Sequence, residues 1–189
     1  MVRPVITAAL ALLTLAAPAG ADLDLTPIDG FYIVEGTRAR DLNFHDGSKV
    51  VSYSPPGNWT PGGGGKQMSL MPQDKIQASA SIEALPATGP LPATEENLKA
   101  YSDLAAGLLP RQASDVKTVG AAVSSVHVCG YALAQVTMTY KFFGQEFETV
   151  ILFMPRPVED VRFRLTCHTA DFKELYRPFE RSLFSIEGL

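Results

Sequence analysis

The chain has 189 residues, of which 46% are hydrophobic, and it carries a formal net charge of −4 at pH 7. This apolar content argues against intrinsic disorder, because disordered chains hold too few apolar residues to build a core. The acidic balance, with no run of basic residues, argues against nucleic acid as a partner, since phosphate backbones require a cationic surface.

The first 21 residues have the pattern of an export signal. Arg3 gives a positive start, Val5 to Ala17 is an apolar run of 13 residues, and Ala19-Gly20-Ala21 is a small-residue cleavage site. The run is too short to span a bilayer, which takes about 20 residues. We predict cleavage before Asp22 and export to the periplasm or beyond. Residues 22–189 are then predicted to form one domain, without a membrane span.

The next segment contains short predicted strands between turns. We expect residues 22–28 to be a loosely ordered acidic leader and residues 31–34 to be an edge strand. A further strand is predicted at 50–53, and Pro61 to Gly65 is predicted to be a flexible loop. Residues 75–85 show the clearest alternation, with Ile76, Ala78, Ala80, Ile82 and Ala84 on one face. The small size of these side chains predicts a bulky helix above them.

The middle of the chain contains the first predicted helix. It follows the Pro-rich linker 86–92 and begins at Thr94, a residue type that favours the N-cap. Its apolar side chains recur at helical spacing until Pro110 stops the helix. Residues 116–128 form another β-prone run, and Cys129-Gly130 then predicts a turn.

The segment from Tyr131 to Ile186 organises the rest of the chain. Three alternating runs end at about Lys141, Met154 and His168, and short turns join them. The helix that follows has an apolar face formed by Phe172, Leu175, Tyr176, Phe179 and Leu183.

Details of this last helix can be predicted from its sequence. Asp171 and Glu174 are spaced as a capping box, and Pro178 predicts a kink or a break. Strands joined by short turns form an antiparallel sheet, so the order strands, helix, strands, helix predicts an α+β layered domain.

One motif and the order of elements resemble the PsbP-like family. The motif is the strand, proline and tryptophan sequence from Val51 to Trp59, and the resemblance extends over about residues 44–186. It implies an α/β/α sandwich with a central, mostly antiparallel sheet. It transfers no catalytic residue, because the family members are mostly accessory or binding proteins. The glycines at 62–65 depart from the tight turn of that family.

Catalytic motifs are weak in this sequence. Gly62 to Gln67 resembles a phosphate-binding loop, but Thr60 replaces its first glycine, Gln67 replaces its hydroxyl residue, and a strand follows. His45-Asp46 offers a base beside an acid, but adjacent side chains usually point apart. No Gly-x-Ser-x-Gly nucleophile elbow is present.

A basic group is the best candidate for a ligand site. Arg162, Arg164 and His168 share one face of a predicted strand, and Arg156 is close in sequence. Together they could bind a small anion. The alternative is a solvated face or pairing with Glu146 and Glu148 on the neighbouring strand.

Three further residues are predicted to be structural. Trp59 could form an aromatic ligand platform, but we favour a core position beneath the last helix. Phe179 is predicted to bury that helix against the sheet. Cys167 is predicted to be a small core residue and Cys129 a thiol in a turn.

Cys129 and Cys167 could form a disulfide in an exported protein, and with His127 and His168 they could hold zinc. The strand order argues against both sites. It places the cysteines at opposite ends of strands that run the same way, about 30 Å apart at roughly 3.3 Å per residue. A disulfide requires Cα atoms within about 7 Å. We therefore predict no disulfide and no metal site.

These observations predict an exported accessory or binding protein without catalytic activity or cofactor. Its partner is an unknown protein or a small anionic ligand. The alternatives are a small secreted hydrolase that uses His45 or His168, and a periplasmic chaperone-like protein.

Overall fold

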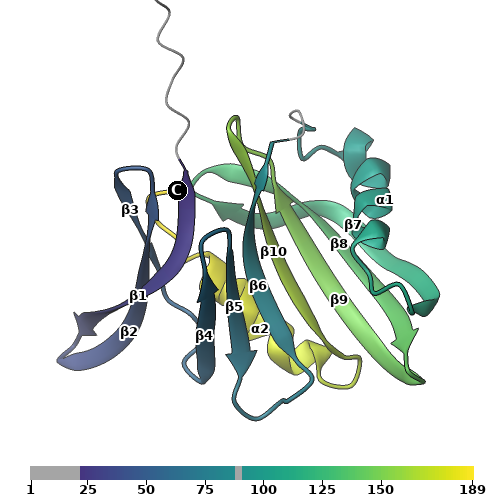
Figure 1. The fold of residues 1–189 in the computed structure, drawn as a ribbon, viewed down its shortest axis with the longest axis horizontal. Helices are drawn as coiled ribbons and strands as arrows, with labels where there is room; N and C mark the ends of the chain where they lie inside the picture. The colour runs from purple at the N-terminus through teal and green to yellow at the C-terminus, as the bar shows by residue number, and fades with distance from the viewer. Residues whose placement is uncertain (1–21, 88–90) are drawn as a thin grey trace, which may run out of the picture.

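The computed structural model describes residues 22–87 and 91–189, whose strands form two sheets (Figure 1). The predicted signal peptide, residues 1–21, lies outside the described residues. In both sheets, each pair of neighbouring strands is antiparallel. No helix in the described part of the chain is long and apolar enough to cross a membrane.

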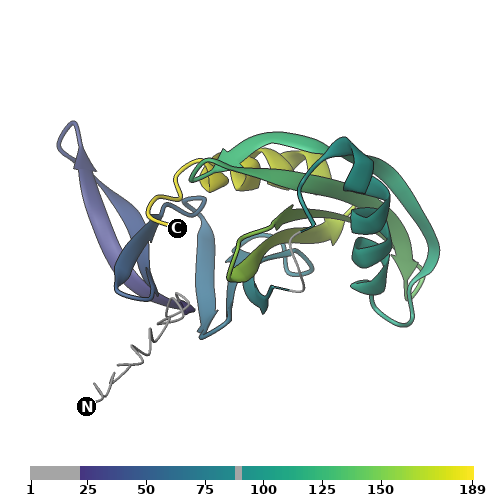
Figure 2. The same ribbon diagram turned by 90° about the horizontal axis from the view of Figure 1, so that it is seen from above.

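The larger sheet has the strand order β4-β5-β6-β10-β9-β8-β7. Its strands are β4 (Trp59–Gly64), β5 (Gln67–Pro72), β6 (Ser79–Pro86), β7 (Ser114–Val128), β8 (Tyr131–Phe142), β9 (Gln145–Met154) and β10 (Glu159–His168). The smaller sheet contains β1 (Leu23–Val34), β2 (Thr37–Asp46) and β3 (Lys49–Tyr53). Figure 2 shows the β1–β2 hairpin projecting away from the larger sheet.

The helices α1 (Leu98–Gly107) and α2 (Phe172–Leu183) lie on opposite faces of the larger sheet. Ile151 of β9 packs in one core cluster with Tyr101 of α1. Its neighbour Leu152 packs in another cluster with Phe179 of α2. Because successive side chains of a strand point to opposite faces, the two helices sandwich the sheet. The predicted α/β/α arrangement with a central antiparallel sheet is therefore confirmed.

The predicted acidic leader is wrong, because its residues form the start of β1. Leu23 and Leu25 are fully buried, whereas Asp22, Asp24 and Thr26 face solvent. This is the alternation of a half-buried strand. The backbone N–H of Leu25 also donates to the carbonyl of Gly65, at 2.6 Å, which joins β1 to the larger sheet.

The predicted flexible loop at Pro61 to Gly65 is also wrong over most of its length. Residues 59–64 form the edge strand β4, where a proline is tolerated because one side of the strand needs no partner. Gly63 has φ of 89°, and a Cβ atom there would lie 2.6 Å from the carbonyl oxygen of Gln67. Gly63 thus allows β4 and β5 to pair closely, and it does not indicate a mobile loop.

The predicted helix starts and one strand start also differ from the structure. A short 3₁₀ turn (Glu95–Asn97) precedes α1, and neither Thr94 nor Asp171 makes a side-chain capping bond. Asp171 instead accepts from Lys75, at 2.6 Å. β6 begins at Ser79, so Ile76 lies in the preceding turn with 94% of its surface exposed. α2 continues through Pro178 as one helix.

The core beneath α2 joins the sheet to the final helix. Trp59 is 2% exposed, and its ring stacks on the fully buried Phe179 with centroids 6.2 Å apart. The small β6 residues Ala80 and Ala84 belong to the same buried cluster as Phe179. Small side chains on the strand thus leave room for these aromatic rings.

Candidate functional site

The first helix covers only part of its face of the sheet. α1 packs on β7 and β8, so the same face of β6 and β10 has no helix above it (Figure 1). The register places Glu83 opposite Arg162 and Ser81 opposite Arg164 on these two strands. A row of polar side chains therefore forms the floor of a groove between α1 and β6.

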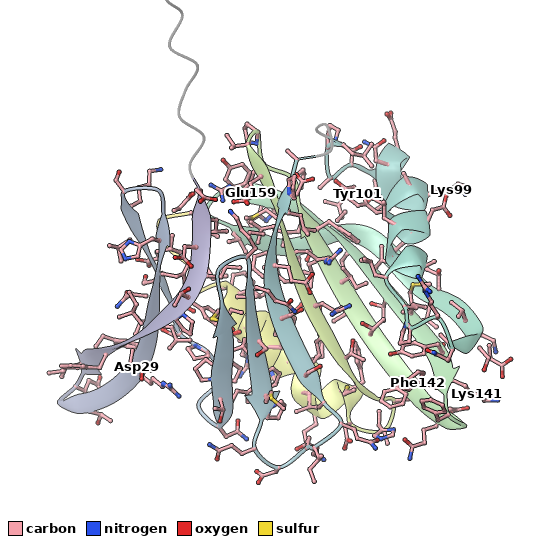
Figure 3. All side chains as sticks on the ribbon, viewed as in Figure 1. Asp29, Lys99, Tyr101, Lys141, Phe142 and Glu159 are labelled. Carbon is pink, nitrogen blue, oxygen red and sulfur yellow. The ribbon has the colours of Figure 1, made fainter. Side chains whose placement is uncertain are left out.

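One end of this groove is an apolar hollow of about 170 Å³. Tyr101 reaches into it from α1 (Figure 3), and its ring lies against Phe153 with centroids 5.0 Å apart. Leu104 lines the same hollow, and 53% of its surface is exposed. Leu85, Leu91 and Leu108 complete the apolar wall. An exposed leucine beside a hollow presents apolar surface that a ligand would remove from water.

The hydroxyl of Tyr101 supports the wall of the apolar hollow. It donates to the backbone carbonyl of Leu91, which ties the linker to α1. Burial, with a smaller effect of the Asp160 carboxylate, raises the pKa of Tyr101 to about 12. The phenol therefore stays protonated at neutral pH and keeps this hydrogen bond.

A charged cluster lies in the middle of the groove. Glu83 accepts from Arg162 and from the hydroxyl of Ser81, the latter at 2.7 Å, while Arg164 Nη2 lies 3.4 Å from its Oε1. Burial alone would raise the pKa of Glu83, but these hydrogen bonds outweigh burial and lower it below the usual value. Glu83 is therefore ionised at neutral pH. Arg162 Nε is buried without a hydrogen-bond partner among the described residues.

The other end of the groove is a polar hollow of about 270 Å³. The side chain of Arg164 is 32% exposed there. Leu108 lines both hollows, which places them side by side beneath the end of α1. We call the two hollows and the charged cluster between them the α1 groove. The hydroxyl-bearing residues of the polar hollow are Ser79, Tyr140, Thr149 and Thr166.

The structure brings together two of the four residues proposed from sequence. Arg162 and Arg164 lie in the α1 groove, and their acidic partner is Glu83 of β6 rather than Glu146 or Glu148. Arg156 Nη2 instead lies 2.5 Å from Asp46 Oδ2 of the smaller sheet. His168 contacts Gln77 and stacks on Phe147, with centroids 4.5 Å apart.

Sequence reasoning missed Glu83, Tyr101 and Leu104 as parts of this site. The signal for Glu83 was present, because a glutamate faces away from the buried alanines of the best-patterned strand. The pairing of β6 with β10 could not be found locally, since these strands are far apart in the sequence.

The histidines form no catalytic pair in the part of the chain that the structure describes. No ion pair there joins a histidine to a carboxylate. His45 is exposed while Asp46 is buried against Arg156, and His127 Nδ1 lies 3.3 Å from the carbonyl oxygen of Ser125. Among the described residues, no group of three or more His, Cys, Asp or Glu side chains could hold a metal ion.

The two cysteines are unpaired in the structure. Cys129 Sγ lies 3.4 Å from the carbonyl oxygen of Ile186, and Cys167 is fully buried in the core beneath α2. Burial raises the pKa of the Cys167 thiol to about 12.

Neither a protein-family model nor a curated protein matches this sequence. The chain is similar in structure to cyanobacterial PsbP from Synechocystis, with a TM-score of 0.48 and 11% identity over 74% of this chain and 86% of that one. It is also similar to LpqN of Mycobacterium tuberculosis, described as involved in cell envelope biogenesis. That match has a TM-score of 0.48 and 11% identity over 85% of this chain and 91% of LpqN. The weak PsbP-like resemblance is thus supported, and it transfers no function.

Proposed function

We propose that this protein is exported and acts as a non-catalytic accessory or binding protein, which holds an apolar group of its ligand in the α1 groove. The observation that carries the proposal is the apolar hollow lined by Tyr101, Leu104 and Phe153. Ligand sites are typically concave and mostly apolar, with a few polar groups that fix orientation. The export step rests on the sequence pattern of residues 1–21.

The size of the hollow limits what it can hold. Complete small-molecule sites measure about 300–1,000 Å³. At about 170 Å³ the apolar hollow accommodates one ring or a short chain rather than a whole molecule. The remainder of the ligand would extend along the groove toward Arg164.

The hydrolase alternative lacks the contacts that it requires. A general base must lie within hydrogen-bond reach of the group it serves, and an acid usually orients it. His168 contacts an amide, Gln77, and His45 is exposed beside a carboxylate that Arg156 already holds. Binding without catalysis is therefore the better supported function.

A second candidate is a chaperone-like or scaffolding role through the projecting β1–β2 hairpin. Large apolar residues of β1 are 43–68% exposed, and these are Ile28, Phe31, Tyr32 and Ile33. Such a cluster is typical of a surface that contacts another protein.

Fluorescence of the neutral probe N-phenyl-1-naphthylamine tests the proposed function in residues 22–189. We expect saturable binding, and we expect Leu104→Asp to abolish it because a carboxylate would enter the apolar hollow. Ile76→Asp is the matched control, since this exposed side chain lies outside the groove. Probe binding that survives Leu104→Asp would show that the groove is not the apolar site.

Affinity capture from the envelope fraction distinguishes the groove from the hairpin. A partner that binds the hairpin should be lost with Ile33→Asp and kept with Leu104→Asp. A partner that depends on a ligand in the α1 groove should be lost with Leu104→Asp and kept with Ile33→Asp.

A further inference from the structure

The polar hollow of the α1 groove carries an excess of positive charge. Arg162 and Arg164 share the single carboxylate of Glu83, and Arg162 makes the closer contact. Among the residues that the structure describes, no acidic side chain lines the polar hollow. Arg164 therefore presents a guanidinium group that its own protein neutralises only in part.

The acid nearest to the apolar hollow does not cancel this charge. Asp160 lines that hollow at the opposite end of the groove, and its Oδ1 accepts from the backbone N–H of Arg156, at 3.3 Å. Asp160 and Arg164 are four residues apart on β10, which corresponds to about 13 Å along a strand. The α1 groove therefore has a negative charge, Asp160, at its apolar end and a positive charge, Arg164, at its polar end.

Hydroxyl groups line the polar hollow together with Arg164, and not all of them are free to donate to a ligand. Thr149 Oγ1 donates to the Leu165 carbonyl at 3.0 Å and lies 2.8 Å from Thr166 Oγ1, so the protons of these two threonines are used within the protein. Ser79 and Thr166 lie opposite each other on β6 and β10 and line the polar hollow with Arg164. The side chain of Ser79 makes no hydrogen bond to another described residue, so its hydroxyl can donate to a ligand. A guanidinium with hydroxyl donors is a recurrent arrangement for binding carboxylate or phosphate oxygens.

Tyr140 adds a donor rather than a negative charge. Burial raises the pKa of its phenol, and the nearby Arg164 offsets only part of that effect. The phenol is therefore protonated at neutral pH and does not repel an anion in the polar hollow.

We propose that the α1 groove binds a small amphipathic anion, with its carboxylate or phosphate group at Arg164 and its apolar group in the hollow beside Tyr101 and Leu104. This inference rests on the proposed binding function and specifies the ligand class. Along β10, Arg164 lies two residues from Arg162, about 7 Å away. A single chain of moderate length thus spans both hollows, whereas a purely ionic or purely apolar ligand fills only one.

Calorimetric titration of residues 22–189 with decanoate, decyl phosphate and decanol tests this proposal. We expect both anions to bind at least ten-fold more tightly than the neutral alcohol, and added salt to weaken only the anions. A difference between decanoate and decyl phosphate identifies which headgroup the site prefers. Equal binding of decanoate and decanol would overturn the anion site.

Substitution of Arg164 separates this inference from the proposed function. Arg164→Gln should weaken decanoate at least ten-fold and leave N-phenyl-1-naphthylamine binding unchanged. Arg164→Lys should retain most of the affinity, because the charge remains. Arg177→Gln, at an exposed arginine of α2, is the matched control.

The outcomes of these titrations are distinct. Probe binding that depends on Leu104, combined with decanoate binding that ignores Arg164, would refute the anion site and leave the proposed function standing. If the unmodified protein does not bind the probe at all, the proposed function is refuted. Decanoate binding that depends on Arg164 but not on Leu104 would refute the amphipathic ligand.

Discussion

At the scale of single residues, the carboxylate of Glu83 is the counter-charge for both groove arginines, Arg162 and Arg164. The side chains of Glu83 and Arg162 are 10% and 12% exposed, so each would be costly to bury alone. Alternation within β10 predicted correctly that Arg162 and Arg164 share a face. It could not identify their partner, because Glu83 is supplied by a strand from the first half of the chain.

Glu83→Gln should therefore destabilise the protein, since it leaves Arg162 without a counter-charge in a buried position. Breaking a buried pair by removing one partner costs roughly 3–5 kcal/mol. The pKa of Glu83 is lowered in the folded state, so its stabilisation is present above the ordinary glutamate pKa. That contribution is lost as the pH falls through the lowered folded pKa.

Urea unfolding at two pH values measures this effect. The difference in unfolding free energy between the original protein and Glu83→Gln should be largest at pH 7 and smaller at pH 3. A difference that does not change with pH would show that Glu83 is not ionised in the folded state. Glu95→Gln, on the exposed 3₁₀ turn, is the control.

The cysteines give a second test at this scale. Native protein should expose one reactive thiol, Cys129, because Cys167 is fully buried and burial raises its pKa to about 12. After denaturation without reductant, thiol titration should find two free thiols per chain. A monomer with no free thiol would mean that Cys129 and Cys167 pair, which the strand order does not allow.

At the scale of elements, the predictions from Tyr131 onward are close to the structure. Before Asp46, the edge strand predicted at residues 31–34 lies within β1, whereas the start of β1 and all of β2 were not predicted. β8, β9 and β10 have long alternating patterns joined by short turns, so local information defines them. β2 was missed because its apolar alternation is short, with only Leu42 and Phe44 as buried hydrophobic residues among those that the structure describes, and because charged residues precede it. β4 was missed because its glycines are typical of a loop, whereas the partner strand β5 explains them.

The packing of α2 on the larger sheet is predicted to depend on the buried ring of Phe179. Phe179→Ala should lower the unfolding free energy by about 3–5 kcal/mol, because the fully buried ring also stacks on Trp59. Phe184→Ala should cost less than about 0.5 kcal/mol, since Phe184 is 59% exposed just after the helix. Chemical denaturation of both variants measures the contrast. An unchanged midpoint for Phe179→Ala would contradict the docking of α2.

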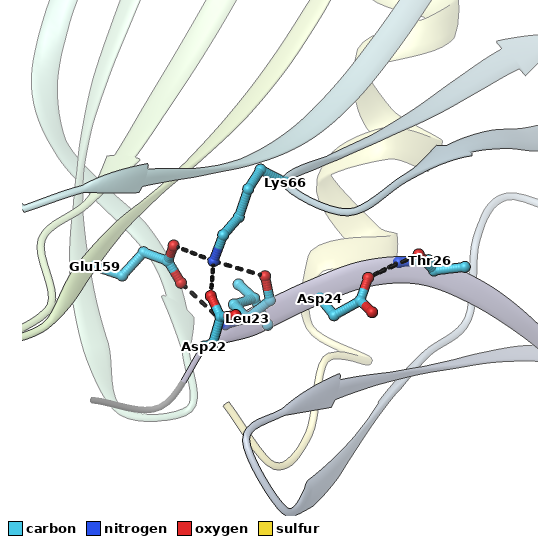
Figure 4. Close-up of polar contacts among 6 residues, drawn as sticks. All are labelled: Asp22, Leu23, Asp24, Thr26, Lys66 and Glu159. Atoms are coloured by element: carbon cyan, nitrogen blue, oxygen red, sulfur yellow. Dashed lines mark hydrogen bonds and ion pairs between the residues drawn. The ribbon is translucent and has the colours of Figure 1, made fainter. Parts of the chain in front are cut away.

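At the scale of the whole molecule, polar links join the smaller sheet to the larger sheet and to α2. Arg156 next to β10 pairs with Asp46 of β2, and Tyr53 of β3 shares a 2.9 Å hydrogen bond with Ser182 of α2. Another link holds the start of β1 (Figure 4). Lys66 contacts Asp22, the carbonyl of Leu23 and the carboxylate of Glu159, the last at 2.6 Å. These links connect segments from both ends of the sequence, which local patterns cannot reveal.

The cluster around Lys66 also determines how the proposed new N-terminus would be held. The backbone N–H of Leu23 donates to Glu159 Oε2, at 3.1 Å, and the Glu159 side chain is 10% exposed. Burial would lower the pKa of Lys66, but its hydrogen bonds to Asp22 and Glu159 outweigh burial and raise it. The lysine is therefore charged below its ordinary pKa, and its stabilisation is lost only as the pH rises through the folded value.

Lys66→Met should release the start of β1, because Glu159 would then remain buried without a cation. We expect a loss of roughly 1–3 kcal/mol, between the values for an exposed and a buried ion pair. Lys99→Met is the matched control, since Lys99 and Asp103 are 85% and 70% exposed and their pair should contribute under about 0.5 kcal/mol. Limited proteolysis, read by intact mass, should cut Lys66→Met first within residues 22–28 and leave Lys99→Met intact there. Equal protection in both variants would show that burial of Leu23 and Leu25 holds β1 without the help of Lys66.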